Sequence, residues 1–187
     1  MSLLEIILIA AGLAMDAFAV SITLGMSRKK LKPVEIIIPG LYFGFFQFLM
    51  PLTGYFAGTY FVNKIQNLDH WIAFILLGFI GGKMIKDSFS AEKPEDTDKN
   101  PFSFVNMLIL AIATSIDALA AGVTFAFFEV NIYRAAVITG LITFFISMAG
   151  TASGGVFGAK LKSKAEFIGG VILVIIGIKI LVEDMLF

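Results

Sequence analysis

The chain has 187 residues, of which 58% are hydrophobic and only 15% are charged. Its mean hydropathy of +0.93 is well above that of soluble domains, so we expect a membrane protein. Fourteen basic residues balance fourteen acidic ones, which gives no electrostatic reason to expect a nucleic-acid partner. The absence of cysteine excludes disulfides and thiolate metal sites.

Long apolar runs with few charges predict six transmembrane helices, each of about 20 residues or more. The predicted spans are residues 3–26, 34–62, 69–88, 102–127, 134–158 and 165–185. Such spans leave no room for a separate soluble domain. The predicted fold class is therefore an all-α integral membrane protein with six transmembrane helices.

The polar segment 90–101 is interpreted as a flexible cytoplasmic linker between a first three-helix repeat, 1–89, and a second, 102–187. Ten of the basic residues lie in the first, third and fifth connections between spans, whereas the second and fourth carry only Lys64 and Arg134. Because basic connections stay in the cytoplasm, both termini are predicted to face outward. No basic segment precedes the first apolar run, so we do not expect a cleaved signal peptide.

The two halves of the sequence resemble each other. Residues 10–25, AAGLAMDAFAVSITLG, align with 111–126, AIATSIDALAAGVTFA, and the spans that follow share several glycines at an offset of 100. Three spans per repeat is an odd number, so the second repeat must enter the membrane from the opposite side. Inverted repeats around a midplane site are common in secondary transporters, which favours a transport function. The polar pairs in the first alignment are Asp16 with Asp117 and Thr23 with Thr124.

Asp16 and Asp117 lie near the middle of predicted spans, where an ionised carboxylate costs at least about 2.5 kcal/mol unless it meets water, a cation or a proton. Two such carboxylates around one small cavity would suit a hard divalent cation. Further oxygen ligands are predicted from the same helix stripes or from aligned positions in the second and fifth spans. These candidate ligands are Thr23, Thr124, Asn106, Gln47 and Ser147.

Two lysines, Lys83 and Lys179, occupy matching positions in the third span of each half. Each precedes an acid by four residues, so one interpretation is an ion pair near a membrane face, Lys179 with Glu183 for example. The alternative is that a lysine neutralises a carboxylate when the cation leaves. Glu35, near the start of the second span, is expected to be solvated.

Residues 12–25, GLAMDAFAVSITLG, and 113–123, ATSIDALAAGV, resemble the signature helices of the MntP family of bacterial manganese exporters. The resemblance extends over essentially the whole chain. It implies a multi-pass pump of the bacterial plasma (inner) membrane, not an enzyme, that expels manganese(II) and holds no permanent cofactor. It also implies that Asp16 and Asp117 are needed for export, and it suggests kinship with exporters of lysine and of cadmium.

Energetics constrain the mechanism separately. Each charge moved across 100 mV costs about 2.3 kcal/mol, so exporting a divalent ion against that potential costs about 4.6 kcal/mol. The sequence has no glycine-rich phosphate-binding loop, so we expect the metal to leave in exchange for entering protons, which the same aspartates could carry. The alternatives are an exporter of another divalent metal or of a basic amino acid, and a membrane scaffold that transports nothing.

Overall fold

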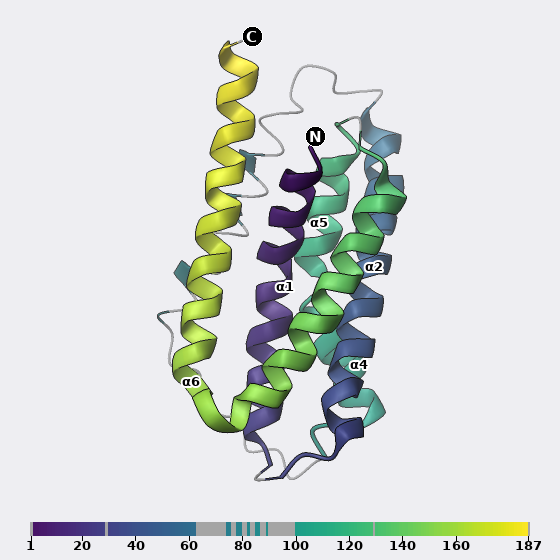
Figure 1. Cartoon of the computed structure of the whole chain (residues 1–187). Coiled ribbons are helices and arrows are strands. Elements are labelled where there is room, and N and C mark those ends of the chain that lie inside the picture. The colour runs from purple at the N-terminus through teal and green to yellow at the C-terminus, as the bar shows by residue number, and fades with distance from the viewer. Residues whose placement is uncertain are drawn as a thin grey trace.

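The computed structural model describes residues 2–28, 30–62, 74–75, 78–79, 82, 85–86, 89, 100–128 and 130–186. Every element within these residues is an α-helix (Figure 1). The predicted third span, 69–88, lies largely outside the described residues. The helices are α1 (Leu3–Met26), α2 (Pro33–Val62), α4 (Phe104–Ala113), α5 (Ile116–Phe125) and α6 (Ile132–Leu186).

Three described helices are long and apolar enough to cross a membrane: α1, α2 and the first part of α6, Ile132–Gly154, which we call the first arm. Helices α4 and α5 together make a fourth candidate span, bent by 40°. This confirms the prediction of an all-helical membrane protein. The bounds of α1 are those predicted, because Ser2 and Glu5 form a capping box that starts the helix at Leu3.

The predicted boundary between the fifth and sixth spans is wrong. Helix α6 continues without interruption from Ile132 to Leu186, and its axis turns back at the lower end of the view in Figure 1. Residues 155–166 contain no proline to stop the helix, while Gly154 and Gly155 lower the cost of bending it. The sixth span is therefore a second arm of α6, which includes the apolar stretch Phe167–Lys179.

Glycines allow the helix backbones to touch. A Cβ added at Gly54 of α2 would overlap the carbonyl of Leu119 in α5, and one added at Gly154 of α6 would overlap the carbonyl of Ile22 in α1. Helix α1 thus packs along the first arm of α6, and α2 packs against both α5 and α6.

The ends of the bundle alternate as predicted. The connection 27–32 and the turn of α6 lie at one end, whereas both termini and the connection 126–131 lie at the other (Figure 1). Asn100 belongs to the first of these ends, because its side chain accepts a hydrogen bond from Arg28. Which end faces the cytoplasm stays a prediction from the basic residues.

Candidate functional site

The fourth span is broken between Ala113 and Ile116, so the single helix predicted for 102–127 is wrong there. At the break, two neighbouring hydroxyls bond to the same backbone carbonyl. The Ser115 hydroxyl donates to the Ala111 carbonyl at 2.6 Å, and the Thr114 hydroxyl donates to the same oxygen at 3.3 Å. The Ser115 amide meanwhile donates to the Ile112 carbonyl, a tight 3₁₀ bond that ends α4.

Gln47 ties α2 to this break. Its side chain is fully buried, and Nε2 donates to the carbonyl oxygen of Thr114 at 3.1 Å. Its Oε1 has no hydrogen-bond partner in the described part of the chain. Gln47 therefore brings one buried, unused acceptor oxygen to the point where the fourth span bends.

The two matched aspartates have different backbone settings. Asp117 lies in the first turn of α5, where the free amides and the helix dipole favour a negative charge. Asp16 lies within the continuous helix α1. Both side chains are half-buried. The break thus gives the fourth span a half-helix terminus that α1, the helix aligned with it, does not have.

The buried apolar residues that the structure describes form two clusters, and along the chain each aspartate lies between a member of one cluster and a member of the other. One cluster includes Leu13 of α1 and Ala118 of α5, and Met50 of α2 packs against it. The other includes Ala17 of α1, Phe43 of α2 and Ala111 of α4. Between members of the two clusters, α1, α2 and the α4–α5 span each carry at least one polar residue. We call these polar residues the polar layer: Asp16, Gln47, Thr114, Ser115 and Asp117.

Three of the other four predicted ligands bond locally. The Thr23 and Thr124 hydroxyls each donate at 3.2 Å to the carbonyl four residues earlier, and the Asn106 amide donates to the Pro101 carbonyl at 2.6 Å. Ser147 is fully buried on α6, and its hydroxyl has no partner among the described residues. A ligand role for these four residues stays a prediction.

Lys179 forms an ion pair with Glu5, which joins the second arm of α6 to the first turn of α1. The side chains of Lys83 and Glu183 lie outside the described residues. Lys179 therefore makes a long-range contact with Glu5. The local pair with Glu183, which the spacing predicts, stays a prediction.

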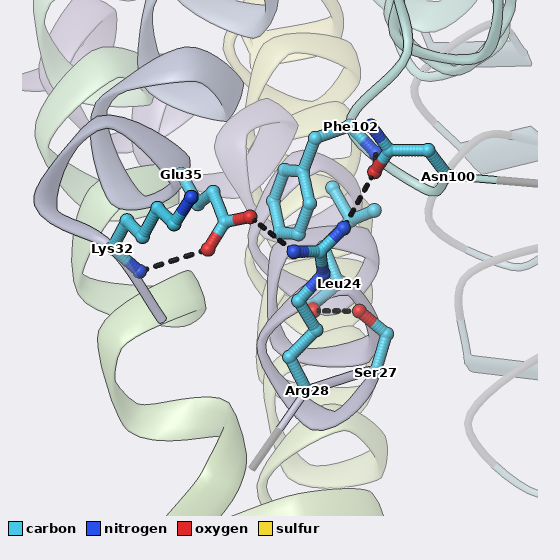
Figure 2. Close-up of polar contacts among 7 residues, drawn as sticks. All are labelled: Leu24, Ser27, Arg28, Lys32, Glu35, Asn100 and Phe102. Atoms are coloured by element: carbon cyan, nitrogen blue, oxygen red, sulfur yellow. Dashed lines mark hydrogen bonds and ion pairs between the residues drawn. The ribbon is translucent and has the colours of Figure 1, made fainter. Parts of the chain in front are cut away.

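Figure 2 shows a further polar cluster, at the end of the bundle that holds the connection 27–32. Arg28 pairs with Glu35 at 2.7 Å, donates to the Asn100 side chain at 2.9 Å and lies over the Phe102 ring. Glu35 also accepts from the Lys32 amide at 2.8 Å. Glu35 is buried and paired, so the expectation that it is solvated is wrong.

One feature was not predicted from the sequence. Four hydroxyl residues recur at intervals of four along the first arm of α6, and all are at most 1% exposed. This spacing within a charge-free span is the sequence signal for a buried polar face. We call it the hydroxyl face: Thr139, Thr143, Ser147 and Thr151.

No group of three or more histidine, aspartate or glutamate side chains within the described residues could hold a metal ion. A cation in this part of the bundle would therefore have to combine the aspartates with amide, hydroxyl or carbonyl oxygens, or with water. Oxygen donors of this kind suit hard divalent ions such as Mg²⁺, Ca²⁺ and Mn²⁺.

Comparison with known proteins identifies the family. A family model described as "Putative manganese efflux pump" matches residues 30–181. Proteins named "Putative manganese efflux pump MntP" from Mannheimia succiniciproducens and Campylobacter jejuni are 50% and 51% identical over the full length of both chains. Another with that name, from Acetivibrio thermocellus, is 49% identical over 99% of this chain and 93% of its own. No solved structure matches. With a family match across most of its length and relatives at half identity, this chain belongs to the MntP family of manganese efflux pumps.

Proposed function

We propose that this protein exports manganese(II) from the cytoplasm of a bacterium, across the inner membrane. The names of its relatives support this substrate. The structural observation that carries the proposal is the polar layer, because it places two carboxylates and a buried amide oxygen between apolar clusters, and oxygen donors of this kind suit a hard divalent cation. The ion is the substrate of the protein and not a resident cofactor.

Asp16 and Asp117 are the proposed principal ligands, with Gln47 Oε1 as a neutral one. Asp117 is the second residue of α5, which begins just after the break. Gln47 binds the break through its hydrogen bond to the Thr114 carbonyl and so helps to position Asp117. Half-helix ends that point toward a midplane site are a recurrent feature of secondary transporters. A movement of α2 would thus be passed directly to the turn that carries Asp117.

Packing between the halves supports the inverted repeat. A Cβ added at Gly40 would lie 2.9 Å from the carbonyl oxygen of Phe144, and one added at Gly140 would lie 2.9 Å from that of Gly44. The two contacts are equivalent under the offset of 100 between the repeats, because Gly40 corresponds to Gly140 and Gly44 corresponds to Phe144. Two pseudo-symmetric halves of this kind could rock about α2 and α6, which would expose the polar layer to either side in turn.

Proton entry is the proposed driving force, because manganese moves outward against an inside-negative potential. The aspartates would bind protons when the metal has left and release them when it returns. In sealed vesicles at clamped voltage, an imposed pH gradient should drive manganese movement. Manganese flux that does not respond to the gradient would exclude proton exchange and leave export itself in place.

The main experiment measures manganese content and manganese tolerance in an exporter-deficient bacterium. The native chain should lower cellular manganese and restore growth, and Asp16→Asn and Asp117→Asn should do neither at equal expression. Asp98→Asn, the same chemical change in the predicted linker, is the matched control and should behave as the native chain. If the native chain leaves manganese unchanged, the metal assignment falls. If the aspartate variants still export, the proposed site falls.

A further inference from the structure

The hydroxyl face of α6 contains two kinds of residue. The Thr139 and Thr151 hydroxyls donate to the carbonyls four residues earlier, at 2.9 and 3.0 Å. This back-bonding is the usual way for a helix to satisfy a buried hydroxyl. The hydroxyls of Thr143 and Ser147, between them on the same face, have no partner in the described part of the chain, although both residues are 0% exposed.

A third such hydroxyl faces them from α1. Ser21 is fully buried, and its Oγ also has no partner within the described residues. The Cβ of Ser21 lies 2.9 Å from a Cβ added at Gly150 of α6. Gly154 contacts Ile22 and Gly25 one turn further on, so α1 and the first arm of α6 run side by side in the same direction (Figure 1).

This register gives the level of the unpartnered hydroxyls along α1 relative to Asp16. One helical turn back from the contact between Ser21 and Gly150 brings α6 to Ser147 and α1 to the turn that carries Asp16. Thr143 follows one turn further along α6. The three hydroxyls thus lie along the contact between α1 and α6. Ser147 is at about the level of Asp16, Ser21 is about one turn to one side of that level, and Thr143 is about one turn to the other.

Buried polar groups in native proteins are almost always hydrogen-bonded, to water if not to protein. We propose that Ser21, Thr143 and Ser147 line a water-filled segment of the cation pathway at the level of Asp16, through which the divalent ion passes with part of its hydration shell. The hydroxyls would bond to the water ligands of the ion instead of to their own helix. The claim that a cation passes through this segment rests on the proposed function, whereas the claim that the segment contains water does not.

Single-cysteine variants give the direct test, because the chain contains no cysteine of its own. The probe is a small, positively charged methanethiosulfonate reagent, which needs water access to reach a thiol. In membrane vesicles, Thr143→Cys and Ser147→Cys should react at least about tenfold faster than Thr139→Cys and Thr151→Cys, whose positions are equally buried but whose native hydroxyls bond to their own helix. Manganese(II) should slow the reaction at 143 and 147. Equal rates at all four positions would overturn the inference.

The outcomes separate this inference from the proposed function. If labelling at 143 and 147 is fast but manganese does not slow it, the segment contains water and the cation does not pass through it. A native chain that moves no manganese overturns the proposed function whatever the labelling shows.

A second measurement removes the hydroxyls without changing shape. Thr143→Val and Ser147→Ala together should reduce the rate of manganese export at least about tenfold, the effect of losing one hydrogen bond to a charged group. Thr139→Val and Thr151→Val are the matched controls and should export normally. If the hydroxyls only fill space, the first pair will raise thermal stability and leave export unchanged, which would overturn the inference.

Discussion

Gln47 of α2 donates from Nε2 to the carbonyl oxygen of Thr114, 3.1 Å away and 67 residues later in the chain, at the break in the fourth span. Both side chains are buried. Thr114 lies at the end of α4, and the last carbonyls of a helix have no hydrogen-bond partner within that helix. Gln47 supplies a partner from another helix. It makes α2 part of the structure that positions Asp117.

Replacing Gln47 with methionine, which has a similar volume but no donor, should therefore destabilise the protein by about 1–3 kcal/mol, because the Thr114 carbonyl would stay buried without this partner. Manganese export should fall as well. Thermal unfolding of the purified protein in detergent and export from cells are the measurements. Thr53→Val, which removes an exposed local hydroxyl bond on the same helix, is the control. Unchanged unfolding and export in Gln47→Met would show that the bond neither stabilises nor positions the break.

Close helix contacts make certain glycines irreplaceable. A Cβ at Gly54 would overlap the Leu119 carbonyl, and backbone cannot move aside as a flexible side chain can. Gly54→Ala should cost at least about 1–3 kcal/mol of unfolding free energy through overpacking. Gly82→Ala is the control, since a Cβ there meets no described atom within 4 Å. The amount of folded, membrane-inserted protein should drop for Gly54→Ala alone, and equal yields would contradict the packing observed.

Arg28 uses both ends of its guanidinium, with Glu35 on one side and Asn100 on the other (Figure 2). Lysine is a point charge and cannot hold both partners, so Arg28→Lys should be destabilising and Arg28→Gln more so, by about 1–3 kcal/mol. Lys30→Gln, an exposed basic residue in the same connection, should have little effect.

If the loss comes from leaving Glu35 unpaired, the double variant Arg28→Gln with Glu35→Gln should recover part of the stability. Thermal unfolding of the two single variants and the double variant measures this. A double variant whose losses simply add would show that Arg28 and Glu35 are not coupled.

Lys179 and Glu5 should behave as a coupled pair. The Lys179 side chain is 47% exposed, so a double-variant cycle with Lys179→Met and Glu5→Gln should give a coupling of only about 0.2–1 kcal/mol in unfolding free energy. Export should respond to the two single changes alike. Loss of export in Lys179→Met together with normal export in Glu5→Gln would favour the alternative in which the lysine neutralises a carboxylate of the transport site.

Membrane orientation gives a prediction that depends on charge alone. Lys30 lies in the basic first connection, and Tyr133 lies in the first turn of α6, which starts at the opposite end of the bundle (Figure 1). Both residues are exposed. In intact cells, a membrane-impermeant thiol reagent should label Tyr133→Cys and not Lys30→Cys, and it should label both after the cells are opened. The reverse pattern would place the termini inside.

Local properties of the sequence were enough to predict the helical membrane class, the bounds of α1 and α2, and the alternation of the bundle ends. Hydropathy over about 20 residues and the positions of lysine and arginine depend only on neighbouring residues. The matching positions of Asp16 and Asp117 could likewise be read directly, because duplication leaves a constant offset in the chain. These features need no knowledge of which helices meet.

Contacts between distant residues decided the rest. The break at Thr114 coincides with two hydroxyl bonds to one backbone carbonyl and with a donor from α2, and hydropathy does not report such a combination. The same holds for the pairing of Glu5 with Lys179. Ser147 and Thr151 have the same kind of side chain on the same helix face, yet only Thr151 bonds back to its own backbone. Side-chain type fixes what a group can bond, whereas the packed neighbours determine which bond it makes.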